Sequence, residues 1–81
     1  MNKHTQKAFE MIEAARPASG YRPQTEAEWS ALQAASVELG YAMGIESGKT
    51  DTHARQIAQL IYGGPAGRLL LEMAFKDDSH A

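Results

Sequence analysis

The three histidines and the acidic residues are the side chains of this 81-residue chain that could bind a metal or transfer protons. His4, His53 and His80 are far apart in the sequence, and none has a second ligand four residues later, as a helical metal site requires. Asp77 and Asp78 lie near His80 close to the end of the chain, where ordering the segment around an ion would cost entropy. We therefore expect no metal and no cofactor.

The other reactive groups show no catalytic arrangement. None of the five serines has the Gly-x-Ser-x-Gly surroundings of a hydrolase nucleophile. Glu10 and Glu13 lie three residues apart on one predicted helix, a spacing typical of a solvated face, and a chain this short cannot easily build a catalytic cleft. Cysteine is absent, which excludes a thiol nucleophile, a disulfide and Cys-ligated zinc. We therefore expect that the protein is not an enzyme.

The segment Gly44–Thr50 is similar to the phosphate-binding loop of nucleotide hydrolases. That loop has four residues between its glycines, whereas this segment has three, so Met43 stands where the first glycine belongs. The loop also follows a buried strand, and no strand pattern precedes this segment. The sequence thus argues against nucleotide hydrolysis, although Lys49 and the start of the next helix could hold an anion or a carboxylate of a partner.

Four stretches with apolar residues at helical spacing must position any functional side chain. The first covers about Lys3–Ala15. The second begins after Thr25, because Thr25 and Glu28 match the pattern of a capping box, in which each side chain bonds to the other's backbone N–H. We expect this helix to end between Tyr41 and Ser47, where glycines weaken the helical pattern.

The third and fourth helices are separated by a pair of glycines. Thr50 or Asp51 can cap the third helix, which should continue to Tyr62. Proline is well suited to the first position of a helix, so we expect the fourth helix to begin at Pro65 or Ala66. Short connections favour antiparallel neighbours, and the sequence therefore predicts an all-α fold, a small compact bundle of three to four helices.

The length and composition predict one domain. We expect a single helical domain over residues 1–75 and a polar, flexible C-terminal tail over residues 76–81. No run of 18 apolar residues occurs, so no membrane-spanning segment is expected, and a cytoplasmic location is consistent with the lack of cysteine.

The apolar stripes predict which helices meet. The second helix has a seam of residues three and four apart, typical of helices that pack at a shallow angle: Trp29, Leu32, Ser36, Leu39 and Met43. The fourth helix is apolar over more than half of its circumference through Leu69, Leu70, Leu71, Met73 and Phe75. We expect these two helices to be the main packing partners. Either the fourth helix is surrounded by the other three, or part of its surface meets another chain, with Tyr62 and Phe75 framing the patch.

The small size indicates a binding protein. A chain of this length buries only about 60% of its unfolded surface, and small domains without disulfides often depend on a partner. We expect a non-enzymatic protein–protein interaction module: a small regulator, inhibitor or assembly subunit of the bacterial, phage or mobile-element accessory type. It would bind a larger protein and could form a homodimer. The candidate partner-binding residues are Tyr21, Arg22, Lys49, Arg55, Tyr62, Arg68, Leu71 and Phe75.

The alternative is a small dimeric regulator that associates with nucleic acid through the helix at Thr50–Tyr62, where His53, Arg55, Gln56 and Gln59 could touch base edges. The net charge of −2, from eight basic and ten acidic residues, gives little attraction for phosphates. Charge reversal at Arg55 and Lys49 would separate the two hypotheses. A small-molecule sensor with a pocket between helices is a third possibility, which the fluorescence of Trp29 would report.

Overall fold

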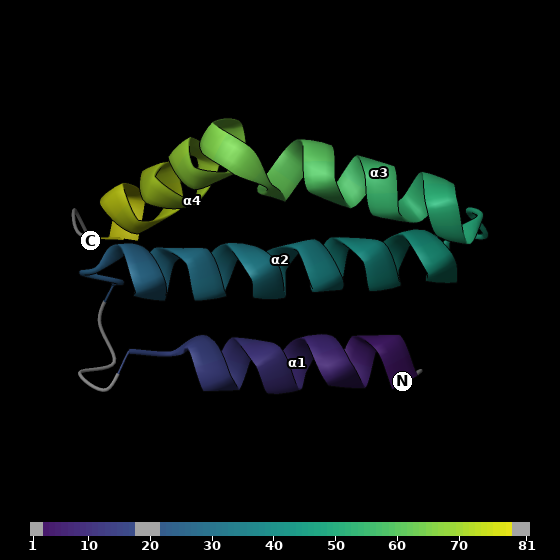
Figure 1. The fold of residues 1–81 in the computed structure, drawn as a ribbon, viewed down its shortest axis with the longest axis horizontal. Helices are drawn as coiled ribbons and strands as arrows, with labels where there is room; N and C mark the ends of the chain where they lie inside the picture. Colours follow the sequence, from purple (N-terminus) through teal and green to yellow (C-terminus); the bar gives the residue numbers. More distant parts are fainter. Residues whose placement is uncertain (1–2, 18–21, 79–81) are drawn as a thin grey trace.

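The computed structural model describes residues 3–17 and 22–78, with side chains as far as residue 75. These residues form four helices: α1 (Lys3–Ala15), α2 (Glu26–Glu46), α3 (Asp51–Tyr62) and α4 (Gly64–Asp78). Helix α2 lies in the middle, with α1 along one side and α3 followed by α4 along the opposite side (Figure 1). The predicted all-α bundle is confirmed. In these described residues, no helix has both the length and the apolar character needed to cross a bilayer.

The helix starts follow local sequence signals. The backbone N–H of Glu28 donates to the Thr25 hydroxyl at 3.1 Å, and the N–H of Thr25 donates to the Glu28 carboxylate at 3.1 Å. The predicted capping box is therefore confirmed. Of the two possible caps for α3, Thr50 takes the role, because its hydroxyl accepts from the N–H of His53 at 3.2 Å.

Small residues allow α3 to approach α2 closely. A Cβ placed on Gly44 would lie 2.8 Å from the Cβ of Ala54, and one on Gly40 would lie 3.2 Å from the Cβ of Ala58. The glycines therefore do not break α2, which continues to Glu46. Five of the eight buried apolar residues described are alanines: Ala8, Trp29, Ala35, Val37, Tyr41, Ala42, Ala54 and Ala58.

The prediction that α2 and α4 are the main packing partners is wrong, because α2 packs mainly against α1 and α3, with much less contact to α4. Of the two alternatives for α4, the one in which the other three helices surround it is not found, since α2 is the central helix. The physical reason is that α1 and α3 present alanines to α2, which permit close helix approach, whereas α4 contacts α2 through bulky groups. The main contact of this kind joins Phe75 to Trp29, with ring centroids 5.8 Å apart at 90°.

The bounds of α4 also differ from the prediction. The helix begins at Gly64 rather than at Pro65 or Ala66, and it continues to Asp78, past the expected domain limit at residue 75. Gly64 has a φ of 68°, which glycine adopts readily, so the chain turns sharply between α3 and α4. No glycine or proline lies in residues 76–78 to stop the helix. The remainder of the expected tail, residues 79–81, lies outside the described residues.

Candidate functional site

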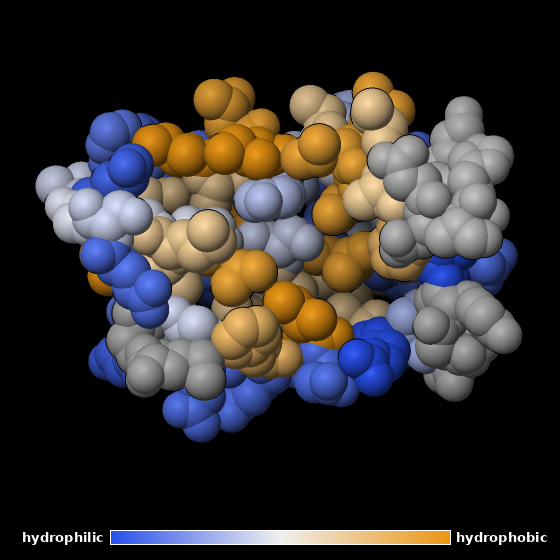
Figure 2. Space-filling view, turned by 180° about the vertical axis from the view of Figure 1, so that it is seen from behind, coloured by the Kyte–Doolittle hydropathy of each residue, from blue (hydrophilic) through white to orange (hydrophobic). Residues whose placement is uncertain are grey.

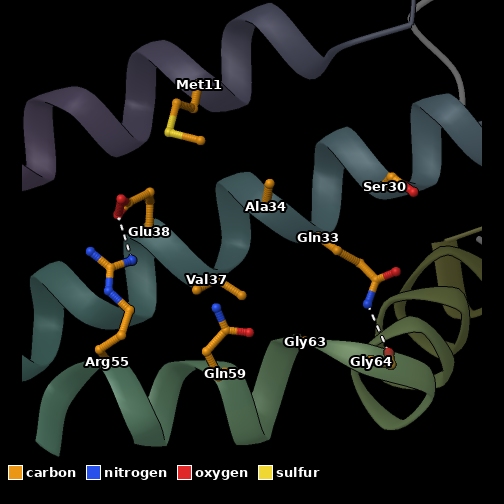
Figure 3. Close-up of a pocket in the computed structure, with 10 residues that line it drawn as sticks. All are labelled: Met11, Ser30, Gln33, Ala34, Val37, Glu38, Arg55, Gln59, Gly63 and Gly64. Carbon is orange, nitrogen blue, oxygen red and sulfur yellow. Dashed lines mark hydrogen bonds and ion pairs between the residues drawn. The ribbon is translucent and has the colours of Figure 1, made fainter. Parts of the chain in front are cut away.

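The side-by-side arrangement of α1, α2 and α3 gives this part of the molecule two faces (Figure 1). One face contains a groove of about 440 Å³, which we call the polar groove (Figure 3). Its lining comes from all four helices and the α3–α4 junction: Met11, Ser30, Gln33, Ala34, Val37, Glu38, Arg55, Gln59, Gly63 and Gly64.

An ion-pair network crosses the polar groove at Glu38. The side chain of Glu38 is only 14% exposed, and its carboxylate lies 3.1 Å from an Nη atom of Arg55 and 3.7 Å from Nζ of Lys7. Figure 3 shows Arg55 reaching from α3 towards Glu38 on α2. Because Lys7 belongs to α1, the network ties all three helices together and neutralises the half-buried carboxylate.

An aromatic cluster surrounds Tyr41 on the same side of α2. The Tyr41 hydroxyl donates to the carboxylate of Asp51, and this hydrogen bond, with burial second, raises the pKa of Tyr41 above its ordinary value. The Arg55 guanidinium lies 4.0 Å from the centroid of the Tyr41 ring. The His4 ring meets Tyr41 edge-on at 5.2 Å. These contacts hold α1 and α3 against α2, so their polar groups serve the fold.

Intramolecular contacts also hold the N-terminal half of α2. The side-chain amide of Gln33 donates to the carbonyl oxygens of Tyr62 at 3.0 Å and Gly64 at 2.8 Å. Arg68 lies 4.5 Å above the centroid of Trp29. The same guanidinium pairs with the carboxylates of Glu26 and Glu72, each at 3.0 Å. Every buried polar side-chain atom in the described part of the chain has a hydrogen-bond partner.

Apolar side chains occupy the opposite side of α1 and α2. Two residues along an α-helix correspond to a rotation of about 200°, so residues two apart point in nearly opposite directions. Phe9 is two residues from Met11, which lines the polar groove. Leu39 and Met43 are each two residues from Tyr41, whose ring contacts Arg55 of the groove. All three therefore point away from the polar groove.

The same rule applies to α3. Ile57 and Ile61 are each two residues from Gln59, which lines the polar groove and points towards α2 (Figure 3). Figure 2 views the molecule from behind and shows apolar atoms across the middle of this side. We define the apolar face as Phe9, Leu32, Ser36, Leu39, Met43, Ile57 and Ile61.

A second exposed apolar strip follows the outer edge of α3 and α4. Leu60 is two residues from Ala58, which packs on α2, and Met73 is two residues from Phe75, which packs on Trp29. Leu60 and Met73 therefore point away from α2. We call this strip the outer edge and define it as Leu60, Leu69 and Met73, all of which are exposed.

Of the eight residues predicted to contact a partner, seven are described, and three of these lie around the Trp29 ring: Arg22, Arg68 and Phe75. Three of the seven are half-buried in the intramolecular contacts described above: Arg55, Tyr62 and Arg68. Leu71 and Phe75 are half-buried on α4, whereas Arg22 and Lys49 are exposed. Arg22 lies 5.6 Å from the centroid of Trp29. Tyr21 lies outside the described residues.

The sequence did not identify the exposed residues of the apolar face as binding residues, because their helical spacing is typical of side chains buried in a core. Phe9, Met43 and Ile61 all fit the helical periodicity, yet all are exposed. The signal that could have found them is the alanine at positions such as Ala8 and Ala54, beside each stripe. Helices that meet through alanines leave their adjacent large side chains uncovered.

Neither face holds a recognisable metal site. Among the side chains described in residues 3–17 and 22–75, no group of three or more histidines or carboxylates is placed to hold a metal ion. The arrangement therefore offers two surfaces that differ in polarity. No protein-family model, no curated protein and no solved structure significantly matches this chain.

Proposed function

We propose that this protein is a non-catalytic protein-interaction module, and that its apolar face contacts another protein. One observation carries the proposal. The buried apolar residues are mostly alanine, whereas Phe9, Met43 and Ile61 of the apolar face are 44% to 58% exposed. A large exposed apolar patch on a small protein marks an interaction site.

The gain from covering the apolar face is large on the scale of a small domain. Each Å² of apolar surface removed from water contributes about 25 cal/mol, so covering one large side chain contributes roughly 1.5–3 kcal/mol. Phe9 and Met43 are residue types enriched at the centre of protein interfaces. Methionine also adapts its flexible side chain to different partner surfaces. The protein would act as a small regulator, inhibitor or assembly subunit.

The polar side supports this proposal over nucleic-acid binding. Arg55 is paired with Glu38, and Arg68 is paired with Glu26 and Glu72. A nucleic-acid-binding surface needs cations that can neutralise phosphates, and these two arginines would first have to lose their carboxylates. The alternative regulator that uses the Thr50–Tyr62 helix therefore gains no support from the position of Arg55.

Photo-crosslinking tests the proposed interaction. A benzophenone amino acid would replace Met43 on the apolar face or, as a matched control, Ala34 on the opposite side of the same helix. In cells that express the full chain, we expect irradiation to give a protein adduct from position 43 and little from position 34. Equal yields at the two positions, or no adduct at position 43, would contradict the proposal.

A further inference from the structure

The seam along α2 has the spacing of a helix-packing surface, but only its first residue, Trp29, is buried against another helix of the chain, through Phe75 of α4. Its residues alternate at intervals of three and four, as in helices that cross at a shallow angle. Leu32 and Leu39 remain half-buried, and Met43 is 58% exposed. No helix of the described chain therefore covers the seam fully from Leu32 to Met43, and a helix from outside the chain would complete it.

The two ends of the seam have complementary shapes. Met43 projects at the C-terminal end of α2. Near the N-terminal end, Leu32 lines a mostly apolar cavity of about 200 Å³ with Ile12 and Phe75, and Arg16 is the one charged residue of its lining. A cavity of about 150 Å³ already accepts a ring the size of benzene, so this cavity can accept a methionine side chain. One face thus carries both a projecting side chain and a hollow that can receive it.

This pairing fixes the symmetry of the contact. Met43 and Leu32 lie about 16 Å apart along α2, at a rise of 1.5 Å per residue. A twofold axis perpendicular to α2 and halfway between them would place each Met43 over the cavity of the other copy. That axis passes between Ser36 and Leu39. The Ser36 hydroxyl already donates to the carbonyl of Leu32 at 2.9 Å, so it can face an apolar surface without losing a hydrogen bond.

The surface area agrees with one such contact. Each partner buries roughly 800 Å² in an interface of standard size. The molecule measures 36 Å by 25 Å in the plane of Figure 1, which is large enough for a contact of that size.

From these observations we propose that a second copy of this chain covers the apolar face, in a twofold dimer whose α2 helices run antiparallel. Met43 of each copy enters the cavity lined by Ile12, Leu32 and Phe75 of the other. This inference rests on the proposed function and names the partner of the same face. A self-complementary surface closes on itself as a twofold dimer.

Sedimentation equilibrium of the full chain tests the stoichiometry. Over a concentration series, we expect the mass to rise to twice that of one chain. Met43→Lys would place an ammonium group in each of two mostly apolar cavities, beside Arg16, so the dissociation constant should rise about 100-fold or more. Ala34→Lys, on the opposite side of α2, should leave the dissociation constant unchanged. Circular dichroism at low concentration would show that both variants keep their helices.

Thiol cross-linking tests the orientation, because the chain contains no cysteine of its own. With a short bis-maleimide reagent, Ser36→Cys should give cross-linked dimer in high yield, because the two positions flank the twofold axis. Met43→Cys should give little, since its two thiols would lie about 16 Å apart along the helices. Ala34→Cys should give none. Efficient cross-linking through Met43→Cys would indicate parallel helices and would overturn the proposed geometry.

The outcomes distinguish this inference from the proposed function. A monomer at all concentrations that still forms an adduct from position 43 with a different protein would overturn the dimer and leave the interaction module standing. A monomer without any adduct would overturn both. A dimer that Met43→Lys does not weaken would place the contact on another surface, which contradicts the proposed dimer.

Discussion

The polar groove and the apolar face lie on opposite sides of the same helices, yet they differ in how their side chains are satisfied. In the groove, Glu38 is paired with Lys7 and Arg55, and Tyr41 donates to Asp51. On the apolar face, Phe9, Met43 and Ile61 remain largely exposed to water. The groove side is therefore complete within one chain, and the apolar face is not.

The monomer obtains its stability mainly from contacts on the groove side. Polar and aromatic contacts on the groove side join α1, α2 and α3, while alanines permit the helices to approach. The large apolar residues that would normally fill a core are on the other side. Substitutions on the groove side should thus lower monomer stability, whereas substitutions on the apolar face should mainly change association.

The largest expected effect is at Trp29, which is buried between Arg68 and Phe75. Trp29→Ala should lower the free energy of unfolding by about 3–5 kcal/mol. A domain of this size has only about 3–5 kcal/mol of net stability, so cooperative unfolding should be lost. Urea denaturation followed by circular dichroism measures the change. Trp29→Phe, which keeps a ring against Phe75, should retain a cooperative transition.

The close approach of α2 and α3 can be tested at Gly44. In Gly44→Ala, the new Cβ would lie 2.8 Å from the Cβ of Ala54. Overpacking costs about 1–3 kcal/mol, and the higher helix propensity of alanine returns up to about 1 kcal/mol. We therefore expect a net loss of about 1–2 kcal/mol in urea titrations. Adding Ala54→Gly should cost less than the sum of the single changes, and simple additivity would argue against the contact.

The ion-pair network should have a smaller effect. Glu38→Gln removes the carboxylate that Lys7 and Arg55 share, but the side chains of the two cations are 64% and 42% exposed to solvent, so screening limits the loss to about 1 kcal/mol. The loss should shrink as salt is added. Glu13→Gln is the matched control, because its pair with Arg16 is exposed on both sides and should contribute about 0–0.5 kcal/mol. Equal losses of unfolding free energy for the two variants would show that the Glu38 network stabilises the fold no more than an exposed ion pair does.

The smallest effect is the pH dependence from Tyr41. Its pKa is raised above 10.0, mainly by the hydrogen bond to Asp51. A raised pKa contributes stability that is fully present below the unfolded value and is lost as pH rises through the folded value. The stability difference between the parent chain and Tyr41→Phe should therefore shrink above about pH 10. Denaturation at several alkaline pH values measures it, and a constant difference would contradict the assignment.

The helices themselves could be predicted because their signals are local. Thr25 and Glu28 are three residues apart, and Thr50 caps the helix that follows it directly. The C-terminal end of α4 was harder to predict, since no glycine or proline stops the helix at residue 75 and it continues to Asp78. Local capping and spacing thus predict helices well.

The faces could not be predicted because they depend on contacts that are distant in the sequence. Arg68 pairs with Glu26, which is 42 residues away, so its charge looked available in the sequence. The periodicity of Leu39 and Met43 shows that a helix should cover them but does not say whether that helix belongs to the same chain. The position of α2 between α1 and α3 in the structure shows whether a helix of the same chain covers these two residues.

The most direct test of the account compares two methionines in the unmodified protein. Met43 on the apolar face and Met73 on the outer edge are 58% and 56% exposed in one chain, so their sulfurs should oxidise at similar rates if nothing covers them. We measure sulfoxide formation at each by mass spectrometry after brief oxidation at high protein concentration. We expect the dimer to protect Met43 from oxidation relative to Met73, and we expect dilution to remove this protection. Equal oxidation of the two methionines at all concentrations would contradict it.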